Sequence, residues 1–329
     1  MAERTRPRSH RSRWCRWVLV LALLVTGALV VGVLTHLRDD LPLETVRARW
    51  ATGASRFVEV DGVQVHYRDE GSGPVVLLLH GTSASLHTWD GWAAELTRHY
   101  RVVRLDLLGF GLTGPSPARD YSIAAYVDFL DHARARLGLD SLLLAGNSLG
   151  GDIAWHYAIA HPDRVRALIL VDSAGYPLTR SPAPLAFKIA RWPLLPRLLT
   201  YLDPAALVEN ALRRCYGDPG RIQPGVLDRY LDLTLRPGNR VAFLDRMRTR
   251  GPDDSALVKT VAQPTLILWG ARDRVIDASH ASRFARDIPG AQLVMYDDLG
   301  HIPMEEDPAR TVRDVEAFLA RVRDRPARR

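Results

Sequence analysis

The segment Gly146-Asn147-Ser148-Leu149-Gly150-Gly151 constrains the fold more than any other part of the sequence. It follows an apolar stretch, 142–145, and precedes a helical stretch, 149–160. A serine on so sharp a strand-to-helix turn has a strained backbone and needs neighbours without side chains. The turn holds the hydroxyl above the sheet, beside free N–H groups at the start of the helix. The motif therefore predicts a nucleophilic serine, Ser148, on an α/β scaffold.

Strand and helix patterns alternate along the rest of the chain. Asp61-Gly62 predicts a hairpin turn between strands 57–60 and 63–67. Short apolar stretches then predict buried parallel strands at 75–79, 102–105, 142–145, 167–171, 265–269 and 293–296. Helical patterns cover 121–137, 149–160, 278–287 and 308–322. We therefore expect an α/β protein with a mostly parallel central sheet and helices on both of its faces.

This alternation breaks once, between residues 175 and 263. The stretch has helical patterns at 205–214, 226–235 and 240–248 and no strand pattern. A helical insertion between two strands of such a sheet predicts a cap over a site at the strand ends. The apolar side chains of this insertion are expected either to line an acyl pocket or membrane-facing entrance, or only to pack within the cap. They are Phe187, Trp192, Leu194, Leu195, Leu198 and Leu199.

A serine nucleophile needs a base, and the base needs an acid that orients it. Asp273 follows the predicted strand 265–269, and His301 follows 293–296. Both lie just past strand ends, as Ser148 does. We therefore predict a catalytic triad of Ser148, Asp273 and His301, with Asp277 and Asp298 as competing candidates for the acid.

The oxyanion of an acyl-transfer reaction needs two N–H donors. We expect one from the backbone of Leu149 and the other from Thr82, with Ser83 as the alternative to Thr82. His80 is interpreted as a buried structural histidine. We expect no metal and no cofactor, because no group of His, Cys and carboxylate residues has metal-ligand spacing.

Together these motifs resemble the α/β-hydrolase family, in its branch with a serine nucleophile and a cap. The resemblance covers residues 57 to 320, and Leu108 departs from it where the family often has proline. It implies the α/β-hydrolase fold and an activity like that of esterases, lipases or meta-cleavage-product hydrolases. It rests on the His80-Gly81 loop, Asp106-Leu107-Leu108-Gly109-Phe110-Gly111, the Ser148 turn, His161-Pro162, Arg164-Val165 and the Asp273 and His301 loops.

We expect hydrolysis of a carboxylic ester, with an apolar or lipid-like small molecule as substrate. The alternatives are carbon–carbon bond hydrolysis of the meta-cleavage-product type and acyl transfer to an acceptor other than water. A non-catalytic binding protein on the same fold is a further alternative.

The N-terminal segment predicts a membrane anchor. Residues 17–37 contain no Asp, Glu, Lys or Arg, and six arginines precede them. As a helix they would span about 31 Å, and the positive-inside bias predicts a cytoplasmic N-terminus and an extracytoplasmic body. The alternatives are a cleaved signal peptide with secretion, and a helix buried in a soluble core.

The basic residues of the chain gather at its two ends. The net charge is +7, but residues 1–17 carry +5 and residues 321–329 carry +4, which leaves −2 for the body. We therefore expect no nucleic-acid partner. The predicted organisation is a basic tail 1–16, an anchor 17–37, a linker 38–55, a core 56–175 and 264–322, a cap 176–263 and an Arg-rich tail 323–329.

Overall fold

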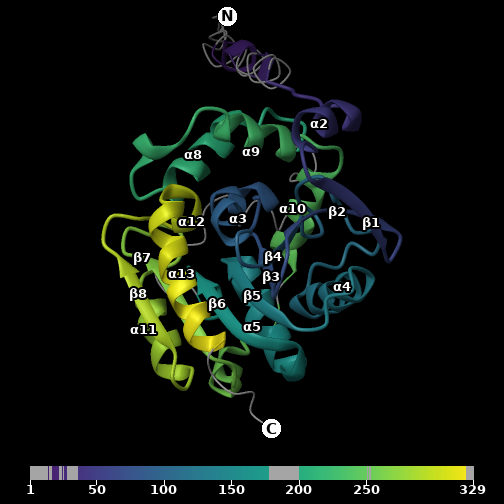
Figure 1. Ribbon diagram of the computed structural model, residues 1–329. Coiled ribbons are helices and arrows are strands. Elements are labelled where there is room, and N and C mark those ends of the chain that lie inside the picture. Colours follow the sequence, from purple (N-terminus) through teal and green to yellow (C-terminus); the bar gives the residue numbers. More distant parts are fainter. Residues whose placement is uncertain are drawn as a thin grey trace, which may run out of the picture.

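We describe the protein from a computed structural model. The described residues are 36–177, 200–249, 251 and 253–323, together with Trp14, 17–21, Leu24 and 26–27. An eight-stranded sheet forms the centre of the body (Figure 1). Its strands are β1 (Ser55–Val60), β2 (Val63–Gly71), β3 (Val75–Leu79), β4 (Arg101–Leu105), β5 (Leu142–Asn147), β6 (Val165–Val171), β7 (Thr265–Gly270) and β8 (Gln292–Tyr296).

The sheet is mostly parallel, as the sequence predicts. Its strand order is β1-β2-β4-β3-β5-β6-β7-β8, and only the β1–β2 and β2–β4 pairs are antiparallel. The hairpin turn at Asp61 and Gly62 has positive φ at both residues, 51° and 78°. Strand β2 continues past its predicted end at residue 67, because its second half pairs with β4. Ser148, Asp273 and His301 follow β5, β7 and β8, so all three lie at the same edge of the sheet.

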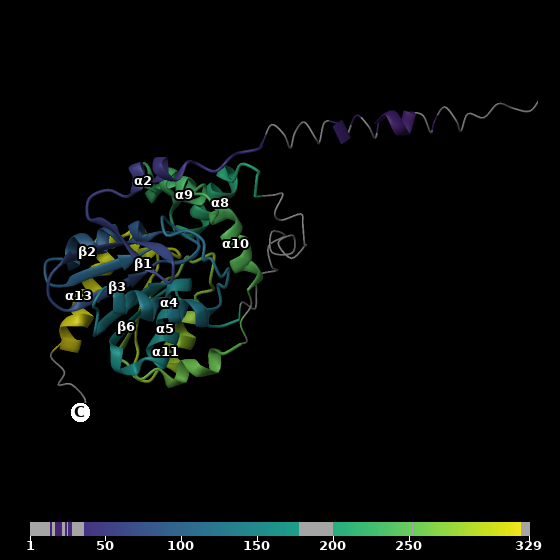
Figure 2. The ribbon, with the colours of Figure 1, turned by 90° about the vertical axis from the view of Figure 1, so that its right-hand side faces the viewer.

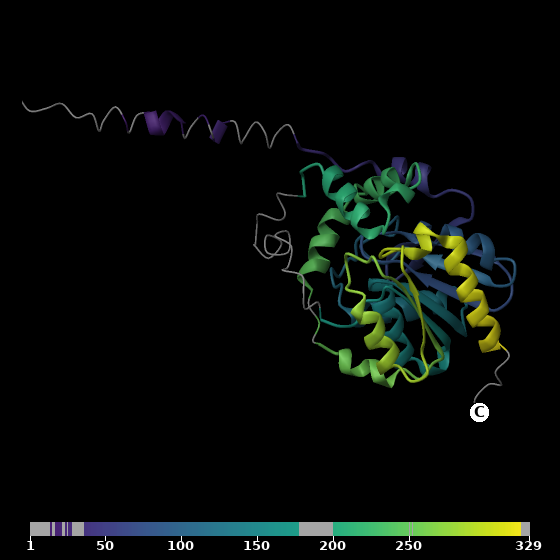
Figure 3. The same ribbon diagram turned by 90° about the vertical axis from the view of Figure 1, so that its left-hand side faces the viewer.

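Alternate residues of the central strands pack into two separate cores. Leu77 and Leu79 of β3 join the core beneath α4, α5 and α11, whereas Val76 and Leu78 join the core beneath α3 and α13. Figure 3 shows the sheet between these two layers of helices. The helices of the two layers are α3 (Asp90–Leu96), α4 (Ile123–Arg136), α5 (Leu149–Ala160), α11 (Ser279–Asp287) and α13 (Pro308–Arg323).

Three short α-helices of the described residues lie outside the predicted pattern, and one of them is α3. The predicted linker 38–55 contains α2 (Leu43–Trp50), and α12 (Pro303–Glu306) follows His301. Val46 of α2 is fully buried against Leu112 and Leu233. Helix α4 begins two residues after the start of the predicted helix 121–137, and the side chain of Ser122 caps it by accepting a hydrogen bond from the N–H of Ala125 at 3.2 Å.

In the described part of the chain, the regular elements between β6 and β7 are helices joined by loops. They include α8 (Ala205–Cys215), α9 (Val226–Thr234) and α10 (Asn239–Arg248). Helices α8 and α9 lie on the same side of the body as α2 (Figures 1 and 2). The six apolar side chains that the sequence offers for an acyl pocket, between Phe187 and Leu199, lie outside the described residues.

Among the described residues, no helix has the length and apolar character to cross a membrane. Residues 22–23, 25 and 28–35 of the predicted span 17–37 lie outside the described residues, so this span stays a prediction. Its last residue, Leu37, forms an antiparallel bridge with Leu202, and the N–H of Arg38 donates to the carbonyl of Tyr201 at 2.8 Å. The chain thus enters the body beside the insertion between β6 and β7.

Candidate active site

Ser148 forms the turn between β5 and α5. Its φ of 53° and ψ of −114° place it in a strained region for a residue with a side chain. The flanking glycines are required by close backbone contacts. A Cβ atom at Gly146 would lie 2.1 Å from the carbonyl oxygen of Gly150, and one at Gly150 would lie 2.2 Å from that of Leu79.

The neighbouring strand holds this strained turn in place. The N–H of Ser148 donates to the carbonyl of Val171 at 3.1 Å, and the carbonyl of Ser148 accepts from the N–H of Ala174 at 3.0 Å. The side-chain amide of Asn147 also donates to the carbonyl of Val171, at 3.1 Å. Three hydrogen bonds to the end of β6 and to the loop after it therefore offset the backbone strain at the serine.

His301 and Asp273 are hydrogen-bonded to each other. The distance from His301 Nδ1 to Asp273 Oδ2 is 2.7 Å, and neither side chain is more than 6% exposed. Asp273 Oδ1 accepts the N–H groups of Val275 at 2.6 Å and Ile276 at 3.0 Å, which fixes the carboxylate. Because an ionised carboxylate only accepts hydrogen bonds, Nδ1 carries the proton, and the lone pair of a neutral ring is on Nε2.

The loop that carries His301 is fastened beside the serine turn. The backbone carbonyl of His301 accepts a hydrogen bond from the side-chain amide of Asn147 at 2.9 Å, and the backbone N–H of His301 donates to the carbonyl of Cys215 at 2.7 Å. In the described part of the chain, no hydrogen bond joins Ser148 Oγ to His301 Nε2. Such catalytic contacts are commonly long before a substrate binds.

The loop after β3 lies against the serine from the other side. A Cβ atom at Gly81 would lie 3.1 Å from the Cβ of Ser148. Among the described residues, neither the N–H of Thr82 nor the N–H of Leu149 has a hydrogen-bond acceptor. Both predicted oxyanion donors are therefore available, and Leu149 is the first residue of α5.

His80 has structural partners in this loop. It is fully buried, its Nε2 accepts from the N–H of Leu107 at 3.0 Å, and its Nδ1 lies 2.7 Å from the carbonyl oxygen of Gly81. Burial lowers the pKa of His80, which favours the neutral ring that this pair of contacts requires. His80 thus holds the loop that presents Thr82.

The two competing acids have other partners. Asp298 is bound by Arg221 at 2.8 Å and by Arg310 at 2.6 Å, and these hydrogen bonds lower its pKa to about 2. Asp277 accepts from the N–H of Ser279 at 2.9 Å at the start of α11. The acid that is hydrogen-bonded to His301 is Asp273.

A second Ser-His-Asp arrangement occurs between β1, β2 and the loop after β4. Ser55 Oγ lies 2.9 Å from His66 Nε2, and His66 Nδ1 lies 2.7 Å from Asp106 Oδ2. Here the serine is in a strand, its own N–H donates to the carbonyl of Thr52, and the next residue pairs with β2. Ser55 Oγ also accepts a hydrogen bond from Arg68 Nε at 3.1 Å, and Ser55 does not lie on a strand-to-helix turn. Its arrangement with His66 and Asp106 is structural.

Sequence reasoning missed two buried acids next to the predicted site. Asp172 directly follows β6 and is fully buried, and burial together with the charge of Asp273 raises its pKa well above the usual value. Glu306 of α12 accepts the N–H groups of Gly300 at 2.8 Å and Gly217 at 2.9 Å. The sequence contains one signal for these acids, the position of Asp172 directly after a strand. The contacts of both Asp172 and Glu306 are with segments that are distant in the sequence.

One group of residues in the described part of the chain has the composition of a metal site. Single ligand atoms of Asp172, Asp273 and His301 lie within 4.8 Å of one another. The donors of Asp273 and His301 are already bonded, since Nδ1 faces Oδ2 and Oδ1 accepts two backbone N–H groups. This arrangement fits a hydrogen-bonded relay better than a set of metal ligands.

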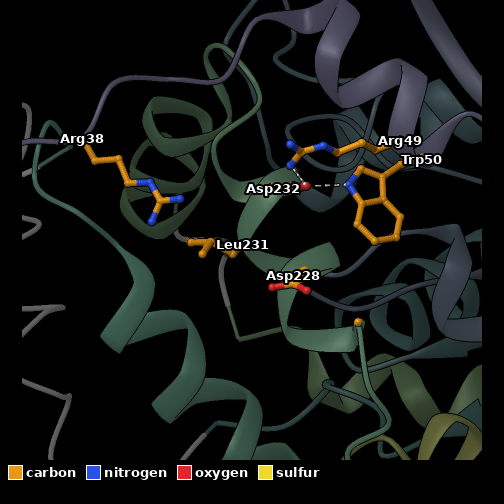
Figure 4. Close-up of a pocket in the computed structure, with 7 residues that line it drawn as sticks. Arg38, Arg49, Trp50, Asp228, Leu231 and Asp232 are labelled. Carbon is orange, nitrogen blue, oxygen red and sulfur yellow. Dashed lines mark hydrogen bonds and ion pairs between the residues drawn. The ribbon is translucent and has the colours of Figure 1, made fainter.

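A separate pocket of about 530 Å³ lies between α2 and α9 (Figure 4). Its Asp232 is bound by Arg49 at 2.9 Å and by the indole N–H of Trp50 at 3.0 Å. Arg38 at its edge is paired with Asp203. This pocket contains none of the predicted site residues.

Comparison with known proteins agrees with this architecture. Residues 74–308 match the family model described as the alpha/beta hydrolase fold. The chain is 33% identical to an uncharacterised protein of Mycobacterium tuberculosis over 279 residues, which is 80% of each chain. It is similar to the crystal structure of a bacterial membrane phospholipase A, with a TM-score of 0.70, 30% identity, and coverage of 95% of this chain and 100% of that one. It is also similar to a meta-cleavage product hydrolase from Pseudomonas fluorescens, with a TM-score of 0.70, 25% identity, and coverage of 82% and 98%.

Proposed function

Because the chain belongs to the α/β-hydrolase family, we propose that it is a serine hydrolase that cleaves a carboxylic ester. In this proposal Ser148 is the nucleophile, His301 is the general base and Asp273 orients the histidine. The observation that carries the proposal is the 2.7 Å hydrogen bond from His301 Nδ1 to Asp273, in a loop fastened to Asn147 next to the strained serine.

The reaction would proceed through an acyl-enzyme. His301 Nε2 takes the proton of Ser148 Oγ as this oxygen attacks the ester carbonyl carbon. The N–H groups of Leu149 and Thr82 bind the oxyanion, and each such donor contributes about 10²–10³ to kcat in other enzymes. His301 then gives its proton to the leaving alkoxide, and the same residues activate the water that releases the acid.

An apolar acyl group or a lipid-like molecule is the proposed substrate class. The insertion between β6 and β7 is joined to the His301 loop, since the carbonyl of Cys215 at the end of α8 accepts the N–H of His301. Two large side chains of this insertion are exposed to solvent, Tyr201 by 58% and Leu207 by 74%. Similarity to a phospholipase A supports the same class.

A series of p-nitrophenyl esters with increasing acyl length tests this substrate class. We expect kcat/KM to rise with chain length, by up to about fourfold for each methylene that the site buries. The rate is measured from release of nitrophenolate at a fixed substrate concentration. A series without hydrolysis of any member would contradict ester cleavage.

Two other reactions use the same residues. Carbon–carbon bond hydrolysis is favoured by the similarity to a meta-cleavage product hydrolase, and turnover of such a substrate in place of esters would identify it. Acyl transfer would appear as an ester product when an alcohol competes with water. A non-catalytic role would leave all of these substrates unchanged.

We also propose that residues 17–37 anchor the chain in a membrane, with the N-terminus in the cytoplasm and the catalytic body on the other side. The apolar composition of this segment and the arginines before it support this proposal. The bridge between Leu37 and Leu202 would place the membrane surface beside the insertion.

Membrane fractionation tests the anchor. We expect the full chain to remain in the membrane fraction after alkaline carbonate washing, and a chain that starts at residue 38 to be released. A mature N-terminus inside or after residues 17–37, determined by mass spectrometry, would instead identify a cleaved signal peptide.

A further inference from the structure

Asp172 lies directly behind the acid of the proposed triad. It follows the last residue of β6, whose carbonyl holds the serine turn, and it is fully buried. One of its carboxyl oxygens, one oxygen of Asp273 and one ring nitrogen of His301 lie within 4.8 Å of one another. Asp172 is therefore close enough to act on His301 through Asp273.

The hydrogen bonds of the two acids are unequal. Asp273 accepts three N–H groups, from Val275, Ile276 and His301. Asp172 accepts only the N–H of Gly270, at 3.0 Å on Oδ1, and its buried Oδ2 has no donor in the described part of the chain. Two carboxyl groups can form a hydrogen bond with each other only if one of them is protonated. The proton belongs on Asp172, because the three donors stabilise the charge of Asp273.

The surroundings of Asp172 favour its neutral form. Burial is the largest cause of its raised pKa, and the charge of Asp273 raises it further. The charge of Glu306 also raises the pKa of Asp172, and the Glu306 carboxylate is held by backbone N–H groups. Cys215 and Tyr296 also interact with Asp172, and because burial raises the pKa of each group, both are neutral at pH 7.

We propose that Asp172 is a positioning residue: a neutral carboxylic acid whose O–H donates a hydrogen bond to the Asp273 carboxylate. This bond holds Asp273 against His301 and withdraws electron density from the carboxylate. It thereby limits how strongly Asp273 retains the proton of the imidazolium. The proposal rests on the hydrolytic function above, and it adds a third member to the relay from Asp273 to His301.

The backbone of Asp172 decides which variants can test this role. Its φ is 44°, in the left-handed region that Asn and Gly adopt with little strain. Asp172→Asn keeps a carbonyl for the N–H of Gly270 and supplies an amide donor for Asp273. Asp172→Gly removes the side chain and fits the same backbone. The pair therefore separates loss of the donor from loss of the fold.

The pH dependence of kcat/KM for the best ester distinguishes the possible roles. If Asp172 is a neutral donor, Asp172→Asn leaves the acid limb where it is in the wild type. Asp172→Gly moves this limb up by about one pH unit, because an unassisted Asp273 holds the imidazolium proton more firmly. We also expect kcat to fall about tenfold in Asp172→Gly with KM unchanged, and to recover in Asp172→Asn.

Two other results would overturn the proposal. If Asp172 is ionised, both variants remove a negative charge near the imidazolium, and the acid limb moves down in both. If Asp172 only fills space, the limb stays in place in both variants, whatever happens to the melting temperature.

Infrared difference spectroscopy tests the protonation state without any turnover. The full-length Ser148→Ala protein, with and without Asp172→Asn, should differ at pH 7 by the carbonyl band of one protonated carboxylic acid. Absence of that band overturns the proposal even if the enzyme hydrolyses esters. If the band is present but the wild-type protein hydrolyses no ester, the protonated Asp172 is confirmed and only the proposed function is rejected.

Discussion

Ser148→Ala is expected to lower kcat for ester hydrolysis by about 10⁴-fold or more, because it removes the atom that forms the acyl-enzyme. The fold should remain. The hydrogen bonds that hold the turn, to Val171 and Ala174, use the backbone of residue 148 and not its side chain. We therefore expect the melting temperature of the variant to stay within a few degrees of the wild type, measured by circular dichroism.

Covalent labelling with a fluorophosphonate probe gives the same prediction without knowledge of the substrate. The wild type should be labelled and Ser148→Ala should not. Ser55→Ala is the matched control, since Ser55 also contacts a histidine that is bonded to an aspartate. It should be labelled like the wild type, because Ser55 lies within strand β1 and its Oγ also accepts a hydrogen bond from Arg68. Labelling that survives Ser148→Ala and is lost in Ser55→Ala would show that the nucleophile is Ser55 and would contradict the assignment of Ser148.

Most parallel strands could be predicted because they are short apolar stretches buried on both faces, as β3, β5, β6 and β7 are. The predicted strand 75–79 matches β3, and the helix predicted at 149–160 matches α5. Helix α2 could not be predicted in this way. Only Val46 of its eight residues is buried, and its partners Leu112 and Leu233 are far away in the sequence.

The two missed acids show where the sequence stops being informative about the site. Asp273 and His301 could be identified because their order and their positions after strands follow from the chemistry of an activated serine. Asp172 also follows a strand, but its environment depends on Asp273, which a strand and an insertion separate from it. Glu306 accepts hydrogen bonds from the backbone N–H groups of Gly217 and Gly300. These two residues are far apart in the sequence, so no local sequence pattern predicts that they meet.

Asp273→Asn is expected to lower kcat by about 10⁴-fold with KM nearly unchanged. The amide oxygen would keep the N–H groups of Val275 and Ile276, so the amide nitrogen would face His301 Nδ1. Because both of these groups would then be donors, the ring must move its proton to Nε2. In that tautomer His301 cannot take the proton of Ser148.

The matched control for this prediction is Asp298→Asn, which changes the competing acid in the loop just before His301. Asp298 is bonded to Arg221 and Arg310 at the surface, so we expect kcat to change by less than about threefold. Steady-state kinetics of both variants on one ester measures the difference, and a larger loss in Asp298→Asn would contradict the assignment of Asp273. Because Asp172→Asn keeps the donor, the informative double variant is Asp172→Gly/Asp273→Asn. If Asp172 acts only through Asp273, this double variant should cost no more activity than Asp273→Asn alone.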